Sequence, residues 1–152
     1  MIHIDIADFL APCDREAICD ELRRFNIENN RAFFAARELP ANAARPLSLA
    51  ARDAQGRLLG GLLAETQFAW MKVSIMAVIP AARGRGIGSR LMAAAEGEAV
   101  VRGCRYAYAD TMDYQAPAFY QKLGYAIAGK LEEWDSHGHA KLFFTKRLAP
   151  KG

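Results

Sequence analysis

The sequence predicts an α/β (α+β) fold built on a mixed sheet, and three observations support this class. Strand-like apolar runs alternate with helix-like runs along the chain. A length of 152 residues suits one domain with a substantial core, and 52% hydrophobic against 24% charged residues is ordinary for a globular protein. A glycine-rich stretch at residues 83–88 falls where an apolar strand is followed by a helix. We therefore expect a single domain over residues 1–152.

The first third of the chain is expected to hold a strand and then helices. Residues 2–6 are expected to form the first strand. Asp14 is suited to cap the helix that follows, which should end near residue 30. In that helix Ile18, Leu22 and Phe25 recur at i, i+4 and i+7 and form an apolar stripe that should face the core. Residues 31–46 are expected to be a short helix and a loop.

The middle of the chain predicts a hairpin and a central strand. Residues 47–52 and 57–68 are expected to pair, and Gly60-Gly61 indicates a bulge or a close approach between chains. Residues 70–78 are apolar on both faces, so this strand should be central in the sheet. Pro80 should stop its pairing, because proline has no N–H to donate.

Helix and strand alternate in the rest of the chain. The helix after the glycines should end at Gly103 and direct four residues toward the sheet, namely Ile87, Leu91, Ala94 and Val101. The later elements should be a strand over residues 105–110, a short helix opening at Ala116-Pro117, a strand from Tyr125 and a last strand over residues 141–148.

Charge and cysteine usage exclude several classes of protein. The net charge is only +3 and no block of Lys and Arg occurs, so no nucleic acid is expected as a partner. No apolar run reaches membrane-spanning length and the amino terminus lacks a signal-peptide pattern, which predicts a cytoplasmic protein. Three scattered cysteines indicate reduced thiols, with Cys104 as a small buried side chain. His137 and His139 lack a third ligand at suitable spacing, so no metal site is expected.

The glycine-rich stretch has the features of an anion site. Three glycines alternate with other residues there, at Gly84, Gly86 and Gly88, and three arginines surround them, at Arg83, Arg85 and Arg90. Glycines allow positive φ and let backbone N–H groups approach a ligand. These N–H groups belong to the first turn of a helix, which favours negative charge, and guanidinium groups match phosphate oxygens. A phosphate or pyrophosphate is the expected ligand.

Three other interpretations of the stretch compete with this one. A dinucleotide fingerprint would place its third glycine at position 89, where the chain has Ser89, and too little chain follows for the second half of such a fold. The phosphate loop of nucleotide hydrolases requires Gly-Lys-Ser/Thr, which is absent. A glycine-rich turn with a solvated basic face is the third alternative.

Two motifs carry a resemblance to a known family. Residues 83–88 resemble the Arg/Gln-x-x-Gly-x-Gly/Ala motif of the GNAT superfamily of N-acetyltransferases, which binds the pyrophosphate of acetyl-CoA. Residues 113–125 resemble its second signature, Asn-x-x-Ala-x-x-Leu/Phe-Tyr-x-Lys-x-Gly-Phe/Tyr, in the right order. The resemblance implies a GNAT-like domain across the chain, with a mostly antiparallel sheet of about six to seven strands. Its fourth and fifth strands would splay apart between Val78 and Tyr106.

The resemblance also implies the residues that bind acetyl-CoA. The pantetheine arm would lie along the strand ending at Val78, whose N–H would donate to the thioester carbonyl, and the glycine-rich stretch would hold the pyrophosphate. The implied cofactor-binding residues are Met76, Ala77, Val78, Arg83, Gly84, Arg85, Gly86, Ile87, Gly88, Ser89, Asp113, Ala116, Phe119 and Lys122. Asp113 stands where the family usually has Asn and adds a negative charge, so its role stays open.

The catalytic residues are less completely specified. Tyr120 falls on the family's tyrosine that can protonate the leaving thiolate, which suits a phenol of pKa about 10; a core aromatic with an exposed hydroxyl is the alternative. Many members place a Glu on the fourth strand as general base, but residues 71–78 contain no carboxylate. Glu65 and Asp110 are the nearest alternatives, acting through water if burial raises the pKa; a merely solvated or hydrogen-bonded carboxylate is the competing interpretation.

The acceptor is inferred from one segment. Residues 131–139 combine acidic and aromatic side chains, which would favour a cationic amine near the site. A solvated loop is the alternative for this segment. Gly138-His139 matches a pair that bacterial members of the family often have before the last strand. We predict an acetyl-CoA-dependent N-acetyltransferase that transfers acetyl directly to a primary amine of a small cationic acceptor. A non-enzymatic acyl-CoA-binding or regulatory domain, and an acetyltransferase of protein or tRNA amines, are the alternatives. A homodimer through an exposed strand at residues 142–144 is also plausible.

Overall fold

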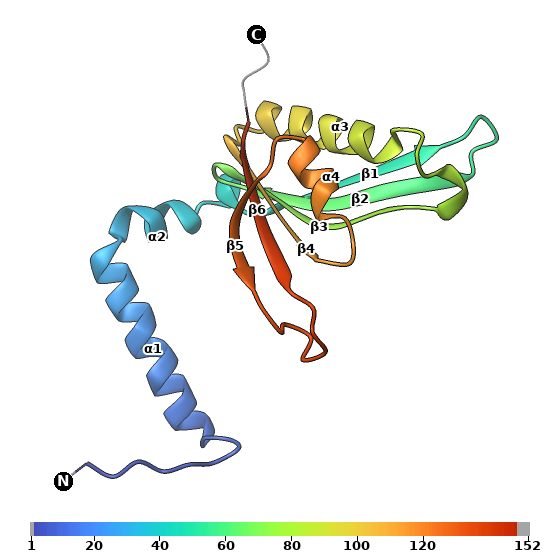
Figure 1. The fold of residues 1–152 in the computed structure, drawn as a ribbon. Helices are drawn as coiled ribbons and strands as arrows, with labels where there is room; N and C mark the ends of the chain where they lie inside the picture. Colours follow the sequence, from blue (N-terminus) through green and yellow to red (C-terminus); the bar gives the residue numbers. More distant parts are fainter. Residues whose placement is uncertain (1, 149–152) are drawn as a thin grey trace. The chain divides into compact units, whose positions relative to one another are not determined.

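The computed structural model describes residues 2–148 (Figure 1). By its internal contacts the chain divides into two compact units, Met1–Ala43 and Ala44–Gly152. The expectation of one domain stays a prediction. Among residues 2–148, no helix combines the length and apolar character that a membrane span requires.

The first unit consists of helices α1 (Pro12–Asn29) and α2 (Arg31–Arg37) and the 3-10 turn η1 (Pro40–Asn42). The strand predicted at residues 2–6 is wrong: this segment pairs with no described strand and is exposed. Alternating apolar residues form a strand only where a neighbouring strand offers backbone partners.

Helix α1 begins and ends for local reasons. Pro12 occupies its first turn, where the missing N–H has no cost, and the N-cap is Ala11 rather than the predicted Asp14. Asp14 lies in the first turn, where its charge favours the helix dipole. The helix ends at Asn29 as predicted, and the Asn30 side chain caps α2 by accepting a hydrogen bond from the Phe33 N–H at 3.3 Å. Packing of the α1 apolar stripe against a core stays a prediction.

The second unit is a six-stranded sheet in the order β1-β2-β3-β4-β6-β5. Its strands are β1 (Arg45–Arg52), β2 (Leu58–Gln67), β3 (Trp70–Val78), β4 (Tyr106–Met112), β5 (Ala126–Leu131) and β6 (Lys141–Arg147). Every neighbouring pair is antiparallel except β3 and β4, which are parallel. The predicted fold class and the mostly antiparallel sheet are confirmed.

The two central strands diverge, as predicted. Strands β3 and β4 pair only from Trp70 to Val73, so the last five residues of β3 have no partner on β4. On the other edge of β3, Val73 and Ile75 face consecutive residues of β2, which leaves Ser74 as a bulge. The predicted close approach lies at Gly60, where an added Cβ would stand 2.7 Å from the Ala77 carbonyl oxygen. Strand β3 therefore offers a free backbone edge near the centre of the sheet.

Helix α3 (Ile87–Val101) covers one face of β1–β3, with α4 (Pro117–Lys122) over the C-terminal strands (Figure 1). The buried residues of α3 are Ile87, Leu91, Met92, Ala95 and Ala99. Ile87 and Leu91 were predicted, whereas the predicted Ala94 and Val101 are exposed. The buried row advances in steps of four because a helix that crosses a sheet obliquely contacts it along an i, i+4 ridge. Gly103, at φ +90°, ends the helix as predicted.

Strand β6 contributes buried residues to the core, whereas β5 is an exposed edge strand. Phe144 is fully buried and Leu142 is nearly so, so the exposed strand that was expected at residues 142–144 is wrong. The ground for predicting a homodimer at this strand is therefore removed. Cys104 is buried, as predicted, and its thiol lies 3.9 Å from the Phe68 carbonyl oxygen.

Candidate active site

The glycine turn, residues 83–88, is shaped by its backbone. Gly84 and Gly86 have φ of +73° and +71°, and Gly86 is the N-cap of α3. Gly88 has a different role, since an added Cβ would stand 3.2 Å from the Phe119 ring. Arg83 ties the turn to the end of β3 by donating from Nε to the Val78 carbonyl oxygen at 3.1 Å. The turn thus exposes the first N–H groups of α3 at the free edge of β3.

A cleft of about 700 Å³ opens at this turn. Its walls come from the end of β3, the glycine turn with the start of α3, and the segment before α4. The lining residues are Met76, Ala77, Val78, Ala82, Arg83, Gly84, Gly86, Ile87, Gly88, Ser89, Tyr114, Gln115, Ala116 and Phe119. The two motifs, far apart in sequence, therefore line one cleft. An anion at the turn and an extended chain along β3 fit these walls.

Three of the residues expected to bind cofactor lie outside the lining of this cleft. Arg85 lines a neighbouring cavity between the β1–β2 hairpin and α3. Lys122 is exposed at the end of α4, and Asp113 is bonded within its own loop region. The lining also includes Tyr114 and Gln115, which the sequence analysis did not single out. Their position inside the second motif was the one available signal.

Tyr120 has a buried ring and a hydroxyl that is not completely enclosed. The ring stacks on Phe144 and meets Phe119 and Tyr125 edge-on, with centroids 5.3–5.7 Å away. Among residues 2–148 its hydroxyl has no hydrogen-bond partner, and no fully buried side-chain oxygen or nitrogen lacks one, so this oxygen is not completely enclosed. Tyr120 itself is not among the residues that line the cleft. Burial, and then the charge of Asp110, raise the pKa of Tyr120. The phenol therefore keeps its proton until a strong base develops beside it.

Neither carboxylate expected as general base lines the cleft. One oxygen of Asp110 accepts a hydrogen bond from the Tyr108 hydroxyl at 2.9 Å, and the other forms an ion pair with Lys141 Nζ at 2.9 Å. Burial, with the neighbouring Asp110, raises the pKa of Tyr108 to about 12. Glu65 is exposed on β2, opposite Lys72 in the pairing with β3. The roles of both carboxylates stay predictions.

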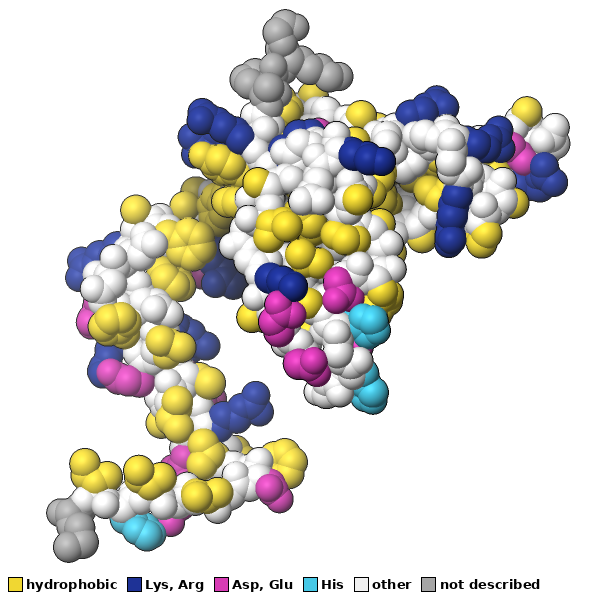
Figure 2. Space-filling model, in the orientation of Figure 1, with side chains coloured by type: hydrophobic (Ala, Val, Ile, Leu, Met, Phe, Trp, Pro, Cys, Tyr) yellow, Lys and Arg dark blue, Asp and Glu magenta, His cyan; other side chains and the backbone are white. Residues whose placement is uncertain are grey.

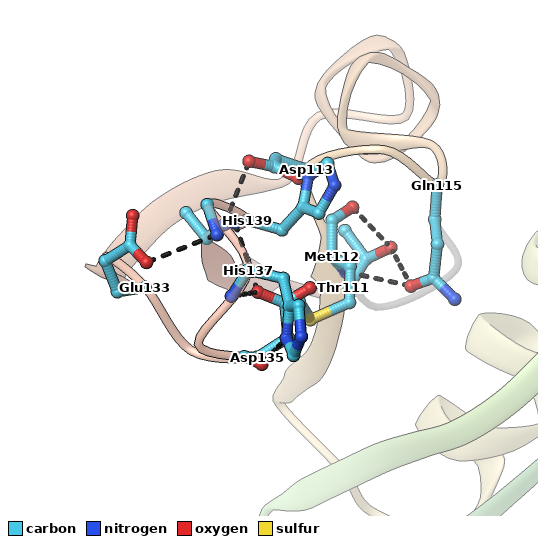
Figure 3. A network of polar contacts seen from close by, with 10 residues as sticks. Thr111, Met112, Asp113, Gln115, Glu133, Asp135, His137 and His139 are labelled. Carbon is cyan, nitrogen blue, oxygen red and sulfur yellow. Dashed lines mark hydrogen bonds and ion pairs between the residues drawn. The ribbon is translucent and has the colours of Figure 1, made fainter.

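Asp113 and His139 form a pair that the sequence did not reveal (Figure 3). His139 Nδ1 lies 3.0 Å from one carboxylate oxygen of Asp113, and the Ala140 N–H donates to the other at 2.9 Å. The His139 ring meets the Tyr114 ring edge-on at 4.8 Å, and Tyr114 lines the cleft. The two partners are 26 residues apart, so no local pattern indicates their contact.

The connection between β5 and β6, residues 132–140, is held by its own carboxylates; we call it the histidine loop. One Asp135 oxygen accepts the N–H groups of His137 and His139, at 2.9 and 3.2 Å. Glu133 accepts the Gly138 N–H at 3.2 Å. Acidic and histidine side chains gather at the tip of this connection (Figure 2).

Two carboxyl groups of this region have lowered pKa values. The Ala140 N–H first, and then His139, lower the pKa of Asp113. The N–H groups of His137 and His139, with the charge of the His139 ring, lower the pKa of Asp135. Both groups are therefore ionised at neutral pH, and the region between Asp113 and β6 carries four carboxylates against two lysines.

Comparison with known proteins places these features in one family. A model of the acetyltransferase (GNAT) family matches residues 9–125. Over 117 residues the chain is 40% identical to blasticidin-S acetyltransferase of Streptomyces morookaense, covering 74% of this chain and 86% of that protein. A crystal structure of an acetyltransferase from Bacillus cereus ATCC 14579 is 28% identical, with a TM-score of 0.71 over 97% of this chain and 98% of that one. An aminoglycoside 6'-N-acetyltransferase complexed with coenzyme A is similar in fold, with 22% identity, a TM-score of 0.63 and 99% of each chain covered.

Proposed function

Because the chain belongs to the acetyltransferase (GNAT) family and takes acetyl-CoA as its acyl donor, we propose that it acetylates the primary amine of a small cationic acceptor. Transfer is direct, from the thioester to the amine in a ternary complex. The observation that supports this most is the single cleft in which the glycine turn, the free edge of β3 and the segment before α4 meet. Holding both reactants in one cleft replaces a bimolecular encounter by an oriented one.

The binding residues act mainly through backbone groups. The N–H groups at the start of α3 hold the pyrophosphate, and Arg83 and Arg85 add positive charge beside it. The unpaired edge of β3 after Val73 bonds the pantetheine amides as a neighbouring strand would. The Val78 N–H donates to the thioester carbonyl oxygen, where negative charge develops during attack. Gly88 lets the Phe119 ring close the cleft over this region.

Tyr120 supplies the proton for the leaving group. Its pKa is raised, so the hydroxyl is protonated at neutral pH, and its oxygen is not completely enclosed. A thiolate that forms beside this hydroxyl takes its proton, which prevents reversal of the C–S cleavage. This role uses the hydroxyl alone, whereas the ring packs in the core.

The cationic acceptor class rests on charge and on similarity. The four carboxylates between Asp113 and β6 give this side of the unit a local excess of negative charge, which attracts cationic amines. The similar protein from Streptomyces morookaense is named for blasticidin S. Blasticidin S is therefore the first acceptor to test, with aminoglycosides, polyamines, amino acids and peptides beside it.

The test is thiol release from acetyl-CoA by the purified full chain with each amine, with calorimetric binding of acetyl-CoA measured alongside. We expect turnover with small cationic amines, an acetylated product in the mass spectrum, and intersecting double-reciprocal lines when both substrates are varied. Turnover only with peptides or tRNA would overturn the proposed acceptor class. Parallel lines would overturn direct transfer, and acetyl-CoA binding without turnover on any amine would favour the non-enzymatic alternative.

A further inference from the structure

We propose that His139, oriented by Asp113, is the general base that removes a proton from the acceptor amine. The proposal rests on the proposed function and identifies a base other than Glu65 and Asp110, the two carboxylates that the sequence predicted. Three observations carry it: the geometry of the pair, its place beside the cleft, and the engagement of the competing carboxylates.

The geometry fixes which ring nitrogen is free. The Asp113 oxygen that lies 3.0 Å from His139 Nδ1 is ionised and can only accept, so the hydrogen belongs on Nδ1. The other Asp113 oxygen is held by the Ala140 N–H, which stops the carboxylate from rotating. Nε2 is then an unprotonated acceptor, and among residues 2–148 it has no partner. A carboxylate that sets the tautomer of an imidazole in this way prepares it to act as a base.

The ring is also in a suitable place. Tyr114 lines the cleft, and its ring centroid lies 4.8 Å from that of the His139 ring, so the imidazole packs against a residue of the cleft wall. The His139 side chain is 45% exposed, which leaves Nε2 accessible to a bound amine. The Asp135 carboxylate accepts the His139 N–H and the Asp113 carboxylate accepts the Ala140 N–H, which hold the backbone that carries the ring.

The competing carboxylates are less suited to this proton. Both oxygens of Asp110 are occupied, by Lys141 and by the Tyr108 hydroxyl, so neither is free to accept a proton from an amine. Glu65 is exposed and lies outside the cleft lining. Imidazole changes its protonation near neutral pH, where an amine must lose its proton to react.

The proposed steps balance. The acceptor ammonium gives one proton to Nε2 of His139, and the amine lone pair then forms the C–N bond to the thioester carbonyl carbon. The C–S bond breaks and its electron pair leaves on sulfur, which takes the Tyr120 proton. The second proton on the attacking nitrogen restores Tyr120, and the imidazolium of His139 releases its proton to water. The net products are the acetamide, CoA thiol and one proton.

Charged groups of both signs surround the ring. Asp113, just after β4, contacts the ring directly, and Asp135 in the histidine loop interacts with it through charge. Lys130 of β5 interacts with Asp113. The charges that face the ring are therefore two carboxylates, with one lysine beside Asp113.

The kinetic test compares His139→Gln with His137→Gln, a matched control in the same loop. The probe amine is blasticidin S or, if another amine of the panel turns over faster, that amine. We expect His139→Gln to lower kcat/KM about 100-fold, to remove the acidic limb of the pH–rate profile and to leave acetyl-CoA affinity unchanged. Added imidazole should restore rate in His139→Ala. An unchanged rate and acidic limb in His139→Gln, with the control alike, would overturn the proposal.

A second measurement does not depend on the acceptor. In the nitrogen-15 spectrum of wild-type protein, neutral His139 should carry its hydrogen on Nδ1. Asp113→Asn keeps the size of the side chain. If the asparagine oxygen still accepts the Ala140 N–H, the asparagine NH₂ group faces Nδ1 of His139. The hydrogen of the ring should then move to Nε2, with a rate loss like that of His139→Gln. An Nε2–H tautomer in the wild type would overturn the pair. Acetyl-CoA binding without turnover on any amine would count against the proposed function, while the tautomer still decides the state of His139.

Discussion

The glycine turn and the histidine loop are both short, irregular segments of the second unit, but different parts of the chain hold them. The glycine turn is shaped by glycines at positive φ and has one side-chain bond to the backbone, from Arg83. In the histidine loop, carboxylates accept backbone N–H groups, and the non-glycine residues Glu133 and Ser136 adopt positive φ. A backbone site can be specified by a few consecutive residues, whereas the histidine loop also has a distant partner, Asp113, which contacts His139 and Ala140. The two segments thus differ in how the sequence specifies them.

If the glycine turn provides affinity and the Tyr120 hydroxyl provides chemistry, Tyr120→Phe should separate the two. We expect kcat to fall about 100-fold, since one positioned acid contributes roughly 10²–10⁴ in rate. Acetyl-CoA affinity should stay the same, because the ring packing on Phe144 is kept. Rapid-mixing measurement of the chemical step, with calorimetry for binding, tests this. An unaltered chemical rate would remove Tyr120 as the acid.

Substitution in the glycine turn should have the converse effect. Gly86→Val places a branched side chain at φ +71°, which costs about 1–2 kcal/mol of backbone strain. Because no atom lies within 4 Å of the added Cβ, the effect arises from the backbone and from the ligand. We expect acetyl-CoA affinity to fall at least about tenfold, measured by calorimetry.

The chain offers a matched control for this strain. Gly56, in the β1–β2 turn, has φ +80° and likewise no atom within 4 Å of an added Cβ. Gly56→Val should therefore lose a similar amount of stability and keep its acetyl-CoA affinity. Equal affinity losses in both variants would mean that general destabilisation, not the anion site, explains the result.

The same contrast decides what could be predicted from the sequence. The strand β3, the glycine turn and the end of α3 at Gly103 follow from local patterns, so they were predicted closely. The prediction of a strand at residues 2–6 is wrong because a strand needs a neighbouring strand to pair with, and no local pattern indicates whether there is one. Of the buried residues of α3 only Ile87 and Leu91 were predicted, since the angle at which the helix crosses the sheet decides which side chains are buried. The contact between Asp113 and His139 could not be predicted, because the two residues come together only when the chain between them has folded.

A smaller effect is expected in the histidine loop. Asp135→Ala removes the acceptor of the His137 and His139 N–H groups, while Asp113 still holds the next residue. We expect faster amide exchange at these two positions, a severalfold loss of kcat and an unchanged acetyl-CoA affinity. Hydrogen exchange resolved by residue, with the kinetic assay, tests this. Slow exchange in the variant would show that other contacts hold the loop.

The smallest effect, acid sensitivity, should distinguish the two segments without any substitution. Backbone N–H donors lower the pKa of Asp113 and Asp135 in the folded chain, below the value of about 3.9 in an unfolded one. A carboxyl with a depressed folded pKa stabilises the fold above its unfolded pKa, and this contribution is lost as pH falls through the folded pKa. Protection of the loop amides should therefore decline below about pH 4. The glycine turn contains no carboxylate, so the two N–H groups hydrogen-bonded at its ends, Arg83 to the Pro80 carbonyl oxygen and Arg90 to the Gly86 carbonyl oxygen, should keep their protection there.

Amide protection factors between pH 6 and pH 2.5, corrected for the intrinsic exchange rate, measure this difference. Asp135→Asn keeps an acceptor oxygen that does not titrate, so in that variant the acid-dependent loss at His137 and His139 should become smaller. If both segments lost protection together, the loop would not unfold locally, and acid would act on the second unit as a whole. Separate loss would instead mean that the acceptor side can open while the glycine turn stays formed, because only the loop depends on ionised side chains for its backbone hydrogen bonds.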